Sequence, residues 1–194
     1  MAINYPLTLP TVTGVRSIEL QAANAVAISR SPFTFASQVH AYSGQMWSAS
    51  LTLPPMKLTA ARQWTAWLTS LRGQYGSFLL GDTSSSQISG TATSAAVTGV
   101  AGDNTVTVTS NGTILAGDMI QIGSASDATL HKVLADQSGN GSLEIWPALR
   151  KARTAAALTL TDARGAFRLA SNEVSWSVDE ASIYGISFSA VEKI

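Results

Sequence analysis

Apolar and polar residues alternate with a period of two along most of this sequence, and that pattern favours antiparallel β structure. Ile18, Leu20 and Ala22 alternate with polar neighbours, and Val26 and Ile28 repeat the pattern. A period of two places the apolar side chains on one face of a strand. Further alternating stretches occupy 47–53, 105–109, 167–169, 174–178 and 184–188. The sequence therefore predicts a mainly β fold of half-buried antiparallel strands.

Within the first half, turn and proline signals are expected to separate successive strands. Phe33 and Phe35 follow Ser31-Pro32 and are predicted to begin a new strand. The segment Tyr42-Ser43-Gly44-Gln45 reads as a turn before the strand that carries Trp47. Pro54-Pro55 ends that strand, because proline has no N–H for the ladder.

One segment has a helical period, and it runs from Thr59 to Arg72. Its apolar residues recur at spacings of three and four: Ala60, Ala61, Trp64, Trp67, Leu68 and Leu71. Thr59 is a suitable N-cap, Arg72 falls in the predicted last turn, and Gly73 is placed for a left-handed C-cap. The sequence predicts one helix whose tryptophan stripe docks on a sheet.

The composition changes abruptly after Gly81-Asp82. Residues 83–162 are rich in Gly, Ser, Thr and Ala with short β-branched runs, and longer alternation returns beyond Asp162. We interpret residues 1–82 plus 163–194 as one antiparallel β-sandwich, a belt domain with one α-helix. Residues 83–162 are predicted to form a small inserted all-β barrel or sandwich module. An insertion between neighbouring surface strands adds little constraint to its host, so the module is expected to be dispensable for the host fold.

The charge pattern excludes several classes of protein. Charged residues make up only 12% of the chain and sum to a net charge of zero, whereas 25 serines and 20 threonines supply the polar surface. Nucleic acid is not an expected partner, since a phosphate backbone requires a basic stripe. No apolar run is long enough to span a membrane, and no secretory signal is visible at Met1. The absence of cysteine excludes disulfides and thiol chemistry.

The inventory of catalytic residues is thin. His40 and His131 both lie in strand-like apolar settings without an acidic neighbour, and Asp179-Glu180 is the only adjacent acidic pair. Successive side chains of a strand point to opposite faces, so that pair is expected at a solvated strand end rather than in a hydrolase cleft. Nucleophile-elbow, dinucleotide and phosphate-loop motifs are absent. The chain is not expected to be an enzyme, and no catalytic or cofactor-binding residue is predicted.

One loop spaces oxygen ligands as a calcium loop does. Asp136, Ser138 and Asn140 alternate, and Gly141 stands at the sixth position, but Pro147 replaces the bidentate glutamate expected at the twelfth. We interpret this loop as a glycine-rich hairpin and predict neither a metal site nor a cofactor.

Four of the five tryptophans are predicted to be core residues. Trp47 and Trp176 lie in phase with apolar strand neighbours, and Trp64 and Trp67 lie on the apolar stripe of the helix. Trp146, followed by Pro147 in the predicted insert, is the one aromatic left open as a ligand or partner contact.

Several segments together resemble distal tail proteins of long-tailed, non-contractile bacteriophages and related tail-like particles. The resemblance rests on packing and turn residues that extend over most of the chain. They comprise Phe33-Thr-Phe35, Tyr42 to Trp47, Leu53-Pro54-Pro55, Trp67 to Gly73, Phe78 to Asp82, Leu115 to Gly123, Leu130 to Val133, Ile145 to Arg150 and Phe167 to Trp176.

The resemblance implies a structural virion protein at the tail tip, synthesised in the cytoplasm of the bacterial host. Six copies would form a ring between the last tail-tube ring and the tail-tip hub protein. The insert would face outward and contact receptor-binding proteins or surface carbohydrate. A carbohydrate-binding or adhesin-like module is the alternative, and Trp146 or another aromatic residue exposed beside polar acceptors would distinguish it.

Overall fold

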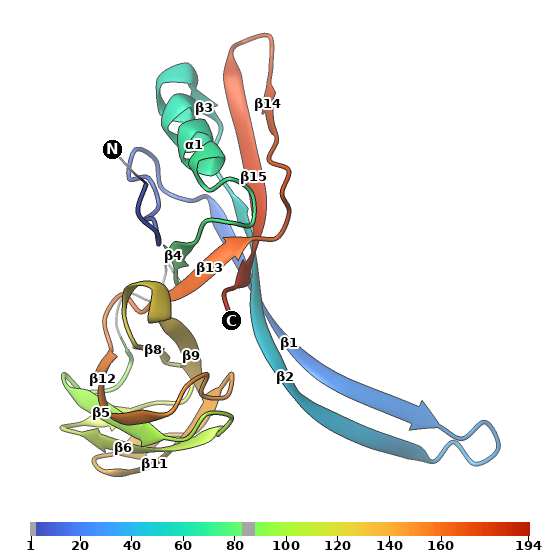
Figure 1. The fold of residues 1–194 in the computed structure, drawn as a ribbon, viewed down its shortest axis with the longest axis vertical. Helices are drawn as coiled ribbons and strands as arrows, with labels where there is room; N and C mark the ends of the chain where they lie inside the picture. Colours follow the sequence, from blue (N-terminus) through green and yellow to red (C-terminus); the bar gives the residue numbers. More distant parts are fainter. Residues whose placement is uncertain (1–2, 83–87) are drawn as a thin grey trace.

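A computed structural model describes residues 3–82 and 88–194 of the chain. The outer segments form a seven-stranded antiparallel sheet, and the middle of the chain forms a closed six-stranded antiparallel barrel (Figure 1). The prediction of a mainly β fold with one α-helix and an inserted β module is confirmed. The predicted first residues of the insert, 83–87, lie outside the described residues, and the first barrel strand begins at Ala95.

The sheet is built from both ends of the chain. Its main path runs β1-β2-β15-β13-β4, and β14 and β3 each pair with β15. The strands are β1 (Ser17–Arg30), β2 (Ser37–Thr52), β3 (Met56–Lys57), β4 (Phe78–Leu80), β13 (Gly165–Leu169), β14 (Trp176–Val178) and β15 (Ile183–Glu192). Helix α1 (Leu58–Ser70) lies against this sheet.

The barrel closes in the order β11-β6-β5-β12-β8-β9. Alternate residues of its strands point inward and form a second apolar core. The strands are β5 (Ala95–Gly99), β6 (Thr105–Ser110), β8 (Met119–Ile122), β9 (Thr129–Val133), β11 (Gly141–Trp146) and β12 (Arg153–Thr159). A small ribbon, β7 (Thr113–Ile114) with β10 (Gln137–Ser138), and the 3-10 turn η1 (Ala125–Asp127) complete the module.

β1 and β2 are much longer than the sequence suggested, and the turn predicted at residues 42–45 is wrong. β2 runs through that segment, and the register against β1 shifts between Asn24 and Val26. Gly44 serves this bulge, because a Cβ added there would meet the Cβ of Ala25 at 3.0 Å. The strand predicted to begin at Phe33 is also wrong. The chain reverses there, and the Ser31 hydroxyl accepts hydrogen bonds from the amides of Phe33 and Thr34.

The helix begins and ends slightly differently from the prediction. Its N-cap is Lys57 without a side-chain cap, so the assignment of Thr59 as the N-cap is wrong. Pairing of β3 with β15 directly before the helix fixes its entry instead. At the other end, Arg72 lies beyond the last turn with φ 52°, and Gly73 follows with φ 67°. The predicted left-handed conformation of Gly73 is therefore confirmed.

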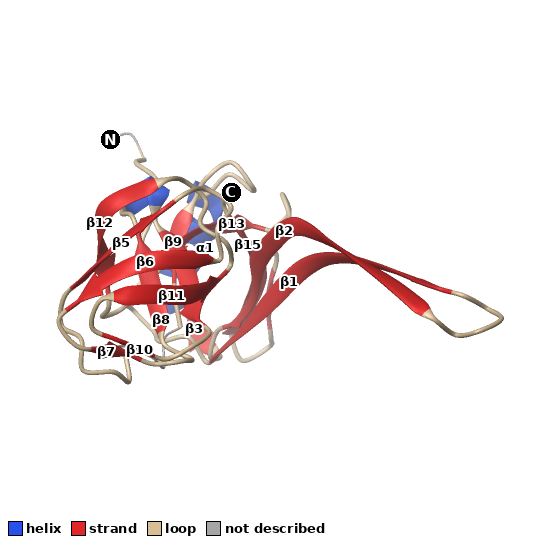
Figure 2. Cartoon of the chain, turned by 90° about the horizontal axis from the view of Figure 1, so that it is seen from below, coloured by secondary structure: helices blue, strands red, loops and turns tan. Residues whose placement is uncertain are grey.

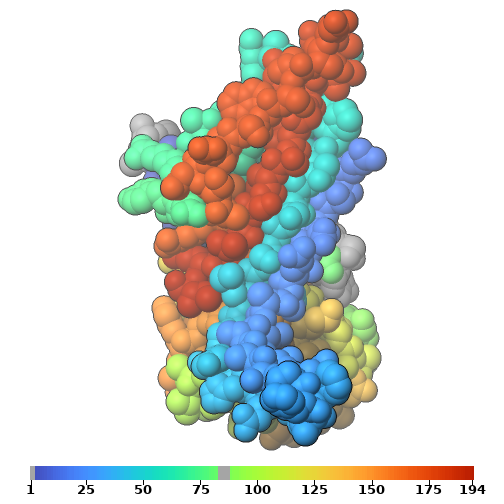
Figure 3. Space-filling model, turned by 90° about the vertical axis from the view of Figure 1, so that its right-hand side faces the viewer, coloured from blue at the N-terminus to red at the C-terminus, as the bar shows by residue number. Residues whose placement is uncertain are grey.

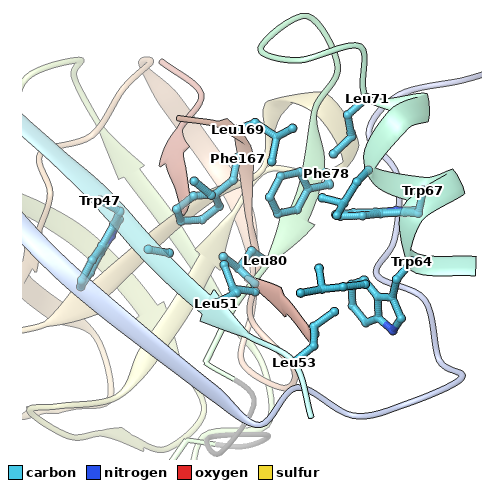
Figure 4. Packing of buried hydrophobic residues seen from close by; sticks show 14 of the residues in the cluster. Trp47, Leu51, Leu53, Trp64, Trp67, Leu71, Phe78, Leu80, Phe167 and Leu169 are labelled. Carbon is cyan, nitrogen blue, oxygen red and sulfur yellow. The ribbon is translucent and has the colours of Figure 1, made fainter. Parts of the chain in front are cut away.

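The tryptophan stripe of α1 docks on the sheet, as predicted (Figure 4). Trp64 is fully buried, and its ring meets the ring of Trp67 edge to face at 5.7 Å. Trp67 also meets Phe78 at 5.1 Å and donates its indole N–H to the carbonyl of Thr8 at 2.8 Å. These contacts join the helix, the sheet and the N-terminal segment in one core.

The outer core extends into the barrel. Met119, Leu130 and Trp146 of the inserted module belong to the same buried cluster as Trp47. Trp47 donates its indole N–H to the carbonyl of Leu130 at 2.9 Å. Removal of the module would expose this part of the core to water, so the packing argues against the expected dispensability of the insert.

Candidate assembly interface

The most distinctive feature of the molecule is a projecting β-hairpin, the arm, which we define as residues 21–44. It extends away from the rest of the chain as a two-stranded ribbon (Figure 2). Every residue of the arm except Ser31 is exposed. Its ten β1 residues, at about 3.3 Å each, give a length of roughly 33 Å.

The arm carries apolar side chains that the described part of the chain leaves exposed. Val26 faces Ala41, and Ile28 faces Val39, so these four side chains lie on one face of the ribbon. At the tip, Phe33 and Phe35 are 92% and 73% exposed. On the other face, the rings of Tyr42 and His40 meet edge to face at 4.6 Å.

A ribbon of this kind is not expected to be stable alone in water. An isolated two-stranded hairpin is marginally stable, and three strands or a covering layer are usually needed. Contiguous exposed apolar side chains also mark interaction sites in soluble proteins. The arm therefore has the composition of an element that is completed by a partner.

The base of the arm is held rigidly against the barrel. The Asn24 side-chain oxygen accepts a hydrogen bond from the Trp146 indole at 2.7 Å. The Gln45 side-chain oxygen accepts one from the amide of Ala148 at 2.6 Å, and Arg150 Nη2 donates to the Gln45 carbonyl at 2.7 Å. These contacts fix the direction in which the arm leaves the body.

Trp146, the one candidate contact residue from the sequence, lies in this junction. It is only 9% exposed, and its ring packs edge to face on Trp47 at 4.5 Å. In the single chain, Trp146 supports the arm and does not present an aromatic platform to solvent.

A buried ion pair strengthens the same junction. The Glu192 carboxylate is 1% exposed and accepts hydrogen bonds from Arg150 Nη2 at 2.7 Å and from the amide of Trp47 at 3.1 Å. Sequence reasoning missed this pair, because the two residues are 42 positions apart and neither lies in a motif.

A second exposed feature is the hairpin formed by β14 and β15. β14 is an edge strand, and its Trp176 is 43% exposed, so the prediction that Trp176 is a core residue is wrong. Asp179 and Glu180 lie in the exposed turn, which confirms the predicted solvated strand end. The Asp179 carboxylate accepts a hydrogen bond from the amide of Ile183 at 2.7 Å.

Beside the base of β14 lies a groove of about 450 Å³. Its lining combines hydroxyl groups of β2 and β15 with the partly buried side chain of Val174. Glu173 lines the groove, and its side chain is exposed. Figure 3 shows this face of the molecule, with β14, β15, β2 and β1 running side by side.

The two histidines lie in different environments. His40 is exposed on the arm, whereas His131 is buried inside the module. His131 Nδ1 donates to the carbonyl of Pro147 at 2.8 Å, and Nε2 lies 2.8 Å from the Thr129 hydroxyl. Burial lowers the pKa of His131 to about 4, which keeps the ring neutral near pH 7.

The remaining sequence candidates have local structural roles. The Asp136 carboxylate accepts a hydrogen bond from the amide of Ala116 at 2.7 Å, and the Asn140 side chain accepts one from Ser110. Among residues 3–82 and 88–194, no three His, Asp or Glu side chains come together as metal ligands. No helix in the described part of the chain has the length and apolarity to cross a membrane.

No protein-family model matches this chain, and a comparison with curated proteins gives no match. Function has to be inferred from the chain itself.

Proposed function

We propose that this chain is a structural subunit of a bacteriophage tail. In this role, six copies form a ring that connects the tail tube to the hub of the tail tip and carries peripheral host-recognition components. The resemblance described above supplies the biological setting, and the arm is the observation that supports assembly.

The physical argument for assembly starts from the arm. Exposure of its apolar face and aromatic tip to water is unfavourable in free energy for an isolated chain, and a neighbouring copy that buried them would gain that free energy. A near-neutral chain with 12% charged residues also has little electrostatic repulsion between copies. An arm that points away from its own body is free to contact a neighbouring copy, and head-to-tail contacts of this kind close into a ring when the rotation between copies closes.

The barrel is placed to act as the peripheral element. It lies on one side of the molecule, away from the β14–β15 hairpin (Figure 1). A sugar-binding role for this module would require an exposed aromatic platform, and Trp146 is buried. The assembly function is therefore preferred over the carbohydrate-binding alternative.

Gold-labelled antibodies against the purified chain test the location. Tailed particles released from cells that carry the gene are imaged by electron microscopy after labelling. The proposal predicts gold at the distal end of the tail. Label on the bacterial surface, or none on particles that contain the chain by mass spectrometry, would contradict it.

A further inference from the structure

We infer that the arm tip of one copy inserts into the β14-side groove of the next copy, with Arg30 paired to Glu173. The inference rests on the proposed assembly function and specifies which surface receives the arm. It combines three independent features of the chain: the aromatic tip, the groove and the distribution of charge.

The tip and the groove match in size. Phe33 and Phe35 are the most prominent apolar side chains of the arm. A cavity of about 150 Å³ holds one benzene ring, so a groove of about 450 Å³ has room for both phenylalanine rings. Val174 would contact them, and the serine hydroxyls of β2 and β15 would face backbone groups of the tip loop.

The arm and the groove side of the molecule also carry opposite charges. Between residues 21 and 44, Arg30 is the only charged side chain, apart from the titratable His40. On the receiving hairpin, residues 171–191 contain the exposed Glu173, Asp179 and Glu180 but no lysine or arginine. In the described part of the chain, neither Arg30 nor Glu173 forms an ion pair. A basic arm and an acidic receiving hairpin attract each other and repel a copy of the same surface.

The arm cannot reach the groove of its own chain. The ribbon leaves the body at a base fixed by Trp146 and Gln45, and its tip points away from β14 (Figures 1 and 2). The contact must therefore be between copies. A contact between two different surfaces allows a head-to-tail arrangement, which a ring requires.

Cysteine cross-linking tests the contact directly, since the chain contains no cysteine of its own. In the full-length double variant Phe33→Cys/Ser175→Cys, one cysteine lies on the tip and the other on the groove rim. Mild oxidation should yield covalent oligomers up to six copies on a denaturing gel. The matched control Phe33→Cys/Ser94→Cys places the second cysteine on an exposed barrel loop and should yield at least tenfold less product.

Charge reversal provides the second test. Arg30→Glu and Glu173→Arg should each weaken self-association about tenfold, and the two changes combined should restore it. Arg62→Glu, on the exposed face of α1, should have no effect. If the wild-type chain forms rings but neither cross-linking nor charge rescue occurs, the arm-to-groove assignment is wrong and the ring proposal stands. If the wild-type chain forms no rings and no cross-links, both are wrong.

Discussion

Truncation of Trp67 tests the packing that joins α1 to the sheet. The ring contacts Trp64, Phe78 and Phe188, and its N–H is donated to the Thr8 carbonyl. Replacing a buried tryptophan by alanine typically costs about 3–5 kcal/mol. Each lost aromatic pair contributes about 0.5–1.5 kcal/mol beyond buried area, which places Trp67→Ala toward the upper end of that range.

The loss is large compared with the net stability of a domain, about 5–15 kcal/mol. For a chain of this size, each 1 kcal/mol lowers the melting temperature by about 2–4 °C, so Trp67→Ala should melt roughly 6–20 °C below the wild type. Thermal unfolding followed by circular dichroism measures the difference. Trp67→Phe keeps a ring but loses the bond to Thr8 and should cost only about 1–2 kcal/mol.

Arg62→Ala, on the exposed face of the same helix, serves as the surface control and should change stability by less than about 0.5 kcal/mol. A melting temperature of Trp67→Ala within two degrees of the wild type would refute the reasoning. In that case, the helix stripe would not contribute to the core of the folded chain.

Three further predictions concern the module and its junction. The pKa of His131 is lowered to about 4 in the folded chain, below the ordinary 6.5, so the unfolded chain binds a proton first as the pH falls. Stability should decline by about 3 kcal/mol between pH 6.5 and pH 4, and urea titrations should show this decline reduced in His131→Gln but unchanged in the exposed-site control His40→Gln. Glu192→Gln leaves the Arg150 charge without its partner and should cost about 3–5 kcal/mol in the same titrations, whereas a loss below 1 kcal/mol would show that the pair is dispensable. Replacing residues 83–162 by a Gly/Ser linker should give an unstable or insoluble protein, because it removes part of the shared core; a cooperative unfolding transition at the wild-type temperature would contradict this.

The sequence predicted the helix and the barrel strands, because the spacing of residues within each segment determines these elements. The helix was predicted because Trp64, Trp67 and Leu68 repeat with its period, and the barrel strands because β-branched residues alternate between turn signals. The turn at Tyr42 to Gln45 was predicted wrongly because Gly44 suggests a turn, whereas in the fold it allows close approach at a bulge.

Features that depend on the tertiary arrangement could not be predicted. Trp176 has the alternation of a core strand, but β14 lies at the sheet edge, where one flank has no neighbour. The Arg150–Glu192 pair joins residues distant in sequence. The arm shares the same period of two as the buried part of β2, and nothing local indicates that its apolar residues lie beyond the core.

The mass of the purified full-length chain tests the central claim, assembly through the arm, most directly. Native mass spectrometry at micromolar concentration should give one discrete species of six times the 20.2 kDa chain mass, and class averages by electron microscopy should show closed six-fold rings. A chain that stays monomeric under these conditions, with its arm exposed to solvent, would contradict the account.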